Sequence, residues 1–186
     1  MIKITGGNFK RKKLDTISKF VRPTSSLKRE AFFSVIESYG LKNSYNYFYK
    51  KVFLDLFAGI GTMGLEAISR GIEYVIFYEN NKEVIKVLEK NCKNLCKKNQ
   101  YEIIEENLVN SNIEINFTSI SIIYIDPPYN QYNINNLLNI LQKKINKKTI
   151  IGVESSIKDN FKIPENFELI KQKKYGKTNL SFLILA

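Results

Sequence analysis

Residues 52–64 read Val-Phe-Leu-Asp-Leu-Phe-Ala-Gly-Ile-Gly-Thr-Met-Gly, an apolar run that passes directly into a glycine-rich loop. The run predicts a buried strand over residues 52–57, and the residues after the loop predict a helix over residues 62–69. The three glycines have the GxGxxG spacing, which allows a tight turn and a close approach of the backbone to a ligand. This stretch therefore predicts an α/β nucleotide-binding fold.

The alternation of strand and helix continues along the rest of the chain. Further strands are predicted at residues 74–78, 102–104, 120–125, 149–153, 167–170 and 180–185, and further helices at residues 82–98 and 135–145. Apolar strands separated by helices predict a Rossmann-like, mostly parallel sheet of seven strands with helices on both faces. The last two strands lack a helix-length connector between them, so we expect them to pair antiparallel at one side of the sheet.

The residues before this pattern predict a different kind of segment. A short strand or hairpin arm is expected first, and then a helix capped by Thr24 or Ser25. That helix places six apolar residues on one face, which predicts that it docks on the core. They are Leu27, Ala31, Phe32, Val35, Ile36 and Tyr39.

Length and composition predict one domain. At 186 residues and 44% hydrophobic content, residues 1–186 suit a single core, with a basic arm over 1–25 and a catalytic core over 26–186. No apolar stretch approaches the roughly 20 residues that span a bilayer, and the first residues do not resemble a signal peptide. We expect a cytoplasmic monomer that does not bind membranes.

Two residue types limit the chemistry. The chain contains no histidine, which excludes histidine bases, histidine-based nucleophilic triads and histidine metal ligands. Its two cysteines, Cys92 and Cys96, lie four residues apart on a predicted helix. A redox pair or half of a metal site is one interpretation, but small apolar residues on a buried helix face are the favoured one. We expect no metal.

The positive charge is concentrated in two segments. The formal net charge is +11, and residues 1–30 hold nine basic and two acidic side chains. A second basic stretch covers residues 171–177. Clusters of this kind neutralise phosphates and release counterions, which favours a nucleic-acid partner over a merely solvated surface.

A second motif follows the apolar run at residues 120–125. Asp126-Pro127-Pro128-Tyr129 ends a predicted strand that should lie beside the strand of residues 52–57. The Asp126 carboxylate and the Pro127 carbonyl can accept both hydrogens of an aryl amine. The Tyr129 ring can stack on the ring of that amine, a contact that contributes about 1–3 kcal/mol. A strand-ending turn without chemistry is the alternative, but the glycine loop upstream favours a site for a planar base.

An acidic residue lies where a cofactor would need it. Glu79 follows Gly59 by twenty residues and suits the two hydroxyls of a ribose, which fits nicotinamide and flavin dinucleotides as well as S-adenosylmethionine. Two features favour the last. Asp55 interrupts a strand that dinucleotide-binding proteins keep apolar, and Asp126-Pro127-Pro128-Tyr129 suits an amino target. The residues thus predict a class I S-adenosylmethionine-dependent methyltransferase.

Several segments, in order along the whole chain, resemble one family, the bacterial RsmD-type 16S ribosomal RNA guanine-N2 methyltransferases. The segments are residues 4–7, Leu14, residues 22–30, the stretch from Asp55 to Gly71, residues 153–155 and residues 174–178. Two positions depart from that family. Ile60 stands where Thr or Ser is usual, and Lys10 to Lys13 replace an Arg-Gly-Arg, which keeps charge but loses bidentate geometry.

The resemblance implies a set of roles. The methyl donor would be S-adenosylmethionine, bound by Asp55, Phe57, Ala58, Gly59, Gly61, Glu79, Asn80 and Asn107. Asp126, Pro127, Pro128 and Tyr129 would hold the target guanine. The RNA-binding residues would be Lys10, Arg11, Lys12, Lys13, Arg22, Thr24 and Arg29. The partner would be 16S ribosomal RNA within the small ribosomal subunit or an assembly intermediate.

Other interpretations remain open at this point. A DNA or RNA adenine-N6 methyltransferase uses a similar tetrapeptide, although no residues are spare for a separate sequence-reading domain. A release-factor glutamine methyltransferase normally carries Asn-Pro-Pro-Tyr and a helical substrate domain. A catalytically silent RNA-binding protein would need no intact Asp126, and a nicotinamide dehydrogenase would need an acid for hydride transfer. Thermal stabilisation by S-adenosylhomocysteine but not by NAD would separate the last from the methyltransferases.

Overall fold

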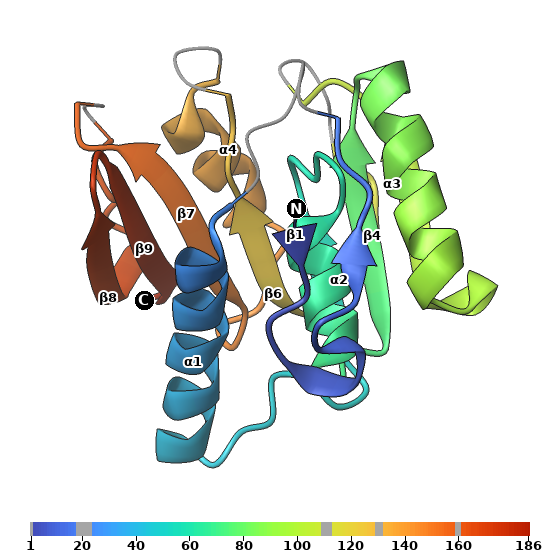
Figure 1. Ribbon diagram of the computed structural model, residues 1–186. Coiled ribbons are helices and arrows are strands. Elements are labelled where there is room, and N and C mark those ends of the chain that lie inside the picture. Colours follow the sequence, from blue (N-terminus) through green and yellow to red (C-terminus); the bar gives the residue numbers. More distant parts are fainter. Residues whose placement is uncertain (1, 18–23, 109–112, 129–131, 159–160) are drawn as a thin grey trace.

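The structure is a computed structural model that describes residues 2–17, 24–108, 113–128, 132–158 and 161–186 (Figure 1). Its helices are α1 (Ser26–Lys42), α2 (Thr62–Ser69), α3 (Lys82–Leu95) and α4 (Ile134–Leu141), with 3-10 turns η1 (Gly7–Phe9) and η2 (Lys98–Gln100). Its strands are β1 (Ile2–Lys3), β2 (Lys13–Leu14), β3 (Val52–Asp55), β4 (Tyr74–Glu79), β5 (Tyr101–Glu105), β6 (Ile120–Ile125), β7 (Ile150–Ser156), β8 (Phe167–Tyr175) and β9 (Thr178–Leu185).

Seven strands form the central sheet in the order β5-β4-β3-β6-β7-β9-β8. The first five are parallel, and β9 pairs antiparallel with both β7 and β8. This confirms the predicted seven-stranded α/β sheet and its antiparallel end. β6 lies beside β3, as the sequence predicted, so the order of the strands reverses between these two. A crevice is expected outside the carboxyl ends of strands at such a reversal.

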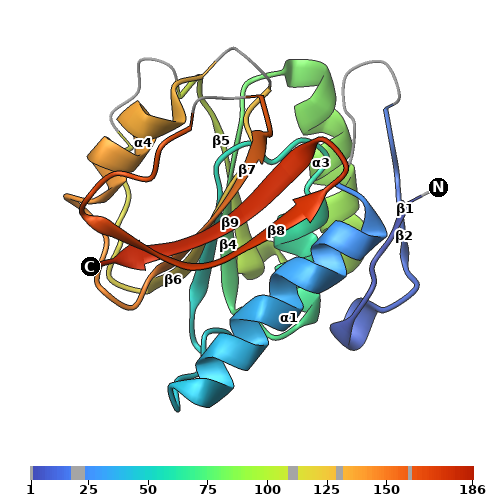
Figure 2. The same ribbon diagram turned by 90° about the vertical axis from the view of Figure 1, so that its left-hand side faces the viewer.

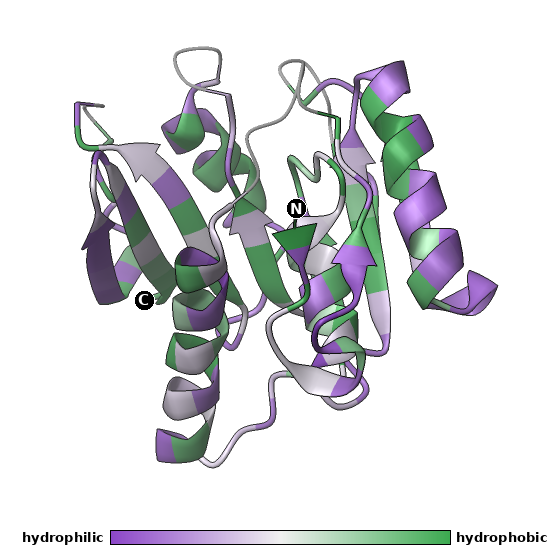
Figure 3. Ribbon diagram, viewed as in Figure 1, coloured by the Kyte–Doolittle hydropathy of each residue, from purple (hydrophilic) through white to green (hydrophobic). Residues whose placement is uncertain are grey.

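Helices cover both faces of the sheet (Figures 1 and 2). One core contains Phe32, Leu65 and Leu88 from α1, α2 and α3, and the other contains Leu138 from α4. Figure 3 shows both hydrophilic and hydrophobic colours along α3, which fits a helix with one buried and one solvent-facing side. Within the described residues, no helix has the length and apolar character to cross a membrane.

Some boundaries differ from those that the sequence predicted. β8 continues to Tyr175 instead of ending at residue 170, because its pairing with β9 extends to the Tyr175–Thr178 pair. Side chains such as Lys171 and Lys174 are exposed there, and an edge strand tolerates such polar residues. α3 ends at Leu95, where Cys96 adopts extended geometry as the C-cap.

The inner face of α1 is only partly the predicted one. Phe32 and Ile36 are fully buried, but Leu27 is 64% exposed, because the first turn of α1 lies over a cleft and not over the core. Gly152 on β7 allows the helix to lie close to the sheet. A Cβ atom at Gly152 would be 2.2 Å from the Phe32 ring, so a larger residue would require the Phe32 ring or the helix to move.

The amino-terminal hairpin β1–β2 is held by a buried carboxylate on α2. Glu66 is fully buried and accepts hydrogen bonds from Thr5 N (2.9 Å to Oε2), Thr5 Oγ1 (2.6 Å) and Gly6 N (2.7 Å). Arg29 and Arg70 lie 3.6 and 3.2 Å from its oxygens. This one side chain therefore joins the hairpin, α1 and α2.

The Glu66→Ala variant should lose at least about 3 kcal/mol of unfolding free energy, because it leaves the buried Arg29 guanidinium without its counter-charge. Urea denaturation measures the loss. The matched control is Glu73→Ala, an exposed carboxylate just after the same helix, which should change stability by no more than about 0.5 kcal/mol. A similarly small change for both variants would contradict the account of the hairpin.

Candidate active site

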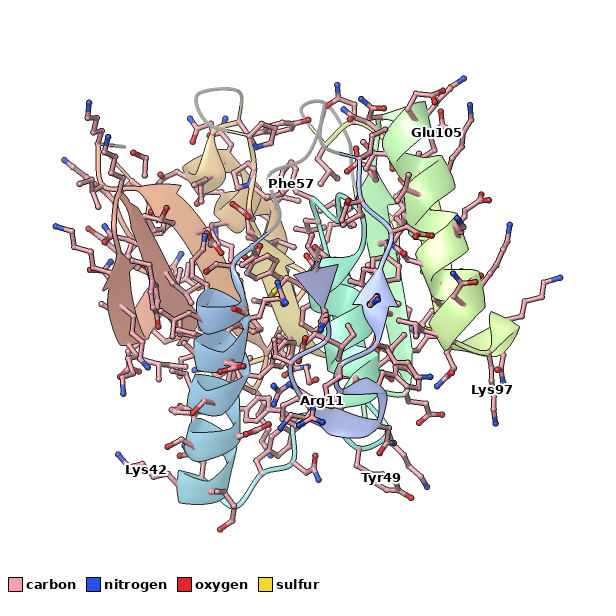
Figure 4. All side chains as sticks on the ribbon, in the orientation of Figure 1. Arg11, Lys42, Tyr49, Phe57, Lys97 and Glu105 are labelled. Carbon is pink, nitrogen blue, oxygen red and sulfur yellow. The ribbon has the colours of Figure 1, made fainter. Side chains whose placement is uncertain are left out.

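A cleft of about 1240 Å³ opens at the carboxyl ends of β3, β4, β6 and β7. The loop after β3 forms one wall, and the start of α1 and the β8–β9 turn contribute to the others. Phe57, at this end of the molecule, is labelled in Figure 4. The cleft therefore occupies the crevice that the reversal of strand order creates.

The loop after β3 has the backbone conformation that its glycines predict. Gly59 and Gly61 adopt φ values of 54° and 85°, which favour glycine, and Gly61 is the N-cap of α2. A Cβ atom at Gly61 would also lie 2.4 Å from Leu88 Cδ1. Phe57, Ala58 and Gly59 line the cleft, whereas Gly61 is not among its lining residues, and cofactor binding by these residues stays a prediction.

Asp55 is the last residue of β3 and is 1% exposed. Its Oδ2 accepts a hydrogen bond from Gly64 N at 3.2 Å, and its Oδ1 has no hydrogen-bond partner among the described residues. Burial, with the nearby carboxylates of Asp126 and Glu79, raises the pKa of Asp55 to about 8. A buried carboxylate with one free oxygen at the floor of a cleft is suited to a cationic ligand.

Glu79 ends β4 and organises two loops. Its Oε2 accepts from Gly59 N at 2.9 Å, and its Oε1 accepts from Asn80 N and Asn81 N at 3.0 and 2.9 Å. Each carboxylate oxygen accepts about two hydrogen bonds, so Oε2 keeps room for a ligand hydroxyl. The predicted contact with a ribose remains a prediction, and Glu79 also fixes the glycine loop.

Asn107, the residue predicted to contact the adenine of the cofactor, lies in a more exposed place than Glu79. Asn107 is exposed, and its Oδ1 accepts a hydrogen bond from the Tyr132 hydroxyl at 3.0 Å. Its neighbours Glu106 and Leu108 line the cleft, as does Asn80. The Tyr132 ring packs edge-on against Phe57, with ring centroids 4.6 Å apart. Tyr132 therefore connects the two predicted cofactor residues, and nothing in the sequence pattern singled it out.

Asp126 follows β6 and faces the same cleft, with Pro127 and Pro128 beside it. Tyr129 lies outside the described residues. Burial and the Glu154 carboxylate raise the pKa of Asp126 to about 7, while Lys28 and the Thr24 hydroxyl act in the opposite direction. The two prolines carry no backbone N–H, so the turn offers acceptors but no competing donors from these residues.

The basic residues of the amino-terminal arm were predicted to lie beside this cleft, but the structure does not gather them there. Arg22 lies outside the described residues. Lys10 to Lys13 are exposed around the η1 turn, which packs against the carboxyl-terminal end of α2, where Phe9 N donates to Ser69 Oγ. That end of α2 is opposite the cleft, and Figure 4 shows Arg11 far from Phe57. The structure therefore does not bring Lys10 to Lys13 to the cleft, and RNA binding by this arm stays a prediction.

Arg29 is not placed for the predicted RNA contact, whereas the contact predicted for Thr24 stays a prediction. Arg29 is 3% exposed and donates to the Thr24 carbonyl and to Lys3 O, at 2.7 Å for the latter, so it cannot meet RNA from this position. Thr24 is buried and lines the cleft near Asp126. Its position suits the pocket for the target base more than a contact with RNA backbone.

Two predictions about cysteine and metal concern the rest of the chain. Cys92 is fully buried, and burial raises the pKa of the Cys96 thiol to about 11, so both suit packing and not reactive thiol chemistry. Within the described ranges, no group of three or more potential metal-ligating side chains comes together. The predicted absence of a metal stays a prediction.

The strand order with its reversed final hairpin is that of the class I methyltransferases, which confirms the predicted fold class. The solved structure of Escherichia coli yhhF matches with a TM-score of 0.82 at 24% identity, over 99% of this chain and 97% of that one. An RNA methyltransferase from Salinibacter ruber, solved with S-adenosyl-L-homocysteine, matches with a TM-score of 0.64 at 13% identity, over 88% and 94%.

Sequence relatives give the family. A family model described as "Conserved hypothetical protein 95" matches residues 2–184. The ribosomal RNA small subunit methyltransferase D of Buchnera aphidicola from Acyrthosiphon pisum is 35% identical, over 92% of this chain and 87% of the relative. The chain belongs to this family, that of the RsmD-type methyltransferases, and the predicted resemblance is confirmed.

The Asp55→Asn variant should make the ligand-free protein more stable at neutral pH, by about 1–3 kcal/mol, because the native protein must take up a proton at Asp55 when it folds there, whereas an amide needs none. The unfolded chain releases this proton near the ordinary pKa of 3.8, whereas the folded chain holds it to about 8. Stability of the native protein should therefore fall as pH rises across that interval.

Denaturation at about pH 5 and about pH 8 measures this effect, and the variant should lose less stability between the two than the native protein does. Leu54→Ala at the neighbouring buried position is a control, since it should destabilise equally at both pH values. An Asp55→Asn variant with an unchanged pH dependence would contradict the assigned environment.

Proposed function

We propose that this protein transfers a methyl group from S-adenosylmethionine to the exocyclic N2 amine of a guanine in 16S ribosomal RNA. The observation that carries the proposal is the position of Asp126 and Pro127 across one cleft from the glycine loop of β3. The name of the Buchnera relative supports a ribosomal RNA substrate. The substrate would be the small subunit or an assembly intermediate, and the enzyme a cytoplasmic monomer.

The acidic cleft suits the proposed methyl donor. S-adenosylmethionine supplies its methyl group from a positively charged sulfonium. The Asp55 and Glu79 carboxylates lie at the floor and rim of the cleft, so they favour a cation there. Phe57, Ala58 and Gly59 would hold its methionine portion. The S-adenosyl-L-homocysteine bound by the Salinibacter protein of the same fold supports this choice.

Asp126 would have two roles toward the target amine. Its carboxylate accepts one amine hydrogen and the Pro127 carbonyl accepts the other, which orients the nitrogen lone pair toward the methyl donor. An amine that gains a methyl group must also release a proton. A carboxylate whose pKa lies at about 7 can accept that proton near neutral pH, in a chain without histidine.

The lysines at the rim of the cleft suit RNA phosphates. Lys158 and Lys177 are exposed and line the cleft, and Lys174 is exposed on β8 close to the same turn. A guanine in structured RNA must leave its stack to reach Asp126, and phosphate contacts near the cleft help to offset that cost. We therefore place the RNA backbone along the β8–β9 turn and not along the amino-terminal arm.

The Asp126→Ala variant tests the function directly. The assay measures the rate of methyl transfer from labelled S-adenosylmethionine to small subunits that lack the modification. This rate should fall by the factor that corresponds to a loss of about 3–4 kcal/mol of transition-state stabilisation, because a positioned acceptor is lost. Mass spectrometry of the RNA should place the wild-type methyl group on a guanine N2.

Two controls accompany this assay. Binding of S-adenosylhomocysteine to Asp126→Ala should stay within a few-fold of wild type. Glu105→Ala, an exposed carboxylate at the end of β5, should keep full activity, because its side chain is 52% exposed. More than a tenth of wild-type turnover in Asp126→Ala would overturn the role of Asp126, and a wild-type product on another atom would overturn the proposed reaction.

A pair of triple variants tests the RNA surface. Replacing Lys158, Lys174 and Lys177 with Ala should weaken substrate binding and lower the logarithmic salt slope by about 3 at most, since about 0.9 is lost for each phosphate contact. Replacing Lys10, Lys12 and Lys13 with Ala removes the same charge at the other end of the molecule and should change the slope little. The reverse pattern would restore the arm as the RNA surface.

A further inference from the structure

Four side chains from three elements meet beneath Asp126. Tyr124 precedes it by two residues, so both face the side of the sheet that α1 covers. On the neighbouring strand β7, Gly152 pairs with Tyr124, and Glu154 follows on the same face. Lys28 comes from the first turn of α1, and Thr24 directly precedes the N-cap of that helix, Ser25. The closeness of α1 at Gly152 brings its first turn over this group.

The central member of the group is a buried carboxylate. The Glu154 side chain is 2% exposed, and it accepts hydrogen bonds from the Tyr124 hydroxyl at 2.5 Å and from Lys28 Nζ. The Tyr124 hydroxyl also lies 3.5 Å from Thr24 Oγ1. The Lys28 side chain is only 17% exposed, so its ammonium is fixed at the cleft wall and not free in solvent.

The charges around Asp126 come from every element packed against it. Asp55 on β3, Glu79 on β4 and Glu154 on β7 are acidic, Tyr124 on β6 is neutral because burial raises its pKa, and Lys28 on α1 is basic. The lysines Lys158 and Lys177 are exposed at the rim. Among the described residues that line this wall of the cleft, Lys28 is thus the cation that is partly buried. Its ion pair is with Glu154 and not with Asp126.

From this arrangement we propose that Lys28 is a positioning residue for methyl transfer, tethered by Glu154 so that it balances the charge of Asp126 without occupying the oxygens that accept the target amine. The inference rests on the proposed function for its link to catalysis. Glu154 and Tyr124 act through Lys28 and do not touch the substrate. The influences of the two charges on the pKa of Asp126 are those that this role requires, since Glu154 raises that pKa and Lys28 lowers it.

The proposal requires opposite effects of two variants on one group. Lys28→Met removes the balancing cation, so Asp126 should titrate at a pH higher by roughly one unit, the lower end of the usual effect of a close opposite charge. Glu154→Gln removes an anion and releases Lys28 toward Asp126, so Asp126 should titrate at lower pH. Lys28→Arg should restore the native value, because it keeps the charge and can reach Glu154.

Carbon-13 NMR of labelled aspartate carboxyl groups in the ligand-free protein measures these titrations without any substrate, and Asp126→Asn assigns the signal. Shifts of Asp126 in the same direction for Lys28→Met and Glu154→Gln, or no shift for either, would overturn the proposal. If one variant does not fold, the sign of the shift in the other decides, because each sign is predicted on its own.

Turnover then tests the catalytic half of the inference. In Glu154→Gln, kcat should fall at least about tenfold at its own pH optimum, because Lys28 competes with the amine for Asp126, while binding of S-adenosylhomocysteine stays unchanged. Lys28→Met should move the acid limb of the kcat/KM profile to higher pH by the same amount as the NMR shift. An unchanged kcat and an unchanged pH profile of kcat/KM in both variants would overturn the positioning role of Lys28. A wild-type protein without methyl transfer would instead reject the proposed function and leave the NMR result standing.

Discussion

The crowding of carboxylates at the carboxyl ends of adjacent strands is the constraint on which the rest of this structure depends. Asp55 on β3 and Asp126 after β6 lie on the two strands between which the order reverses, and Glu79 ends β4. Burial, with the nearby carboxylates of Asp126 and Glu79, raises the pKa of Asp55 to about 8. Burial, with the Glu154 carboxylate, raises the pKa of Asp126 to about 7. Such a group of carboxylates favours a cation in the cleft, and the sulfonium of the proposed methyl donor is one.

The scaffold supports this acidic cleft from both sides of the β3–β6 pair. On one side, glycines let the loop after β3 turn tightly, so that Gly59 N in the loop donates to Glu79 and Gly64 N in α2 donates to Asp55. On the other side, the absence of a side chain at Gly152 lets α1 approach the sheet and bring Lys28 to Glu154. The buried Glu66 ties the amino-terminal hairpin to α1 and α2, which fixes the start of α1 over the cleft.

The fold and half of the site could be predicted from local patterns, and the remainder depended on tertiary placement. Apolar runs and the glycine spacing indicated the strands, the loop and the positions of Asp55 and Asp126, because these follow from chain-local periodicity. Charge counts could not separate Arg29, which is buried against Glu66, from the exposed Lys10. Leu27 fits the apolar face of its helix, yet it lies over the cleft, since periodicity does not say where the sheet ends. Lys28 and Glu154, which are 126 residues apart, meet only in the fold.

Proton release on cofactor binding tests the central claim most directly. Calorimetric titration of S-adenosylmethionine at about pH 7, repeated in buffers of different ionisation enthalpy, counts the protons exchanged. A cation bound in the cleft should lower the raised pKa values of Asp55 and Asp126, so we expect net proton release, reduced in Asp55→Asn. Binding with no proton exchange, or with net proton uptake, would contradict it.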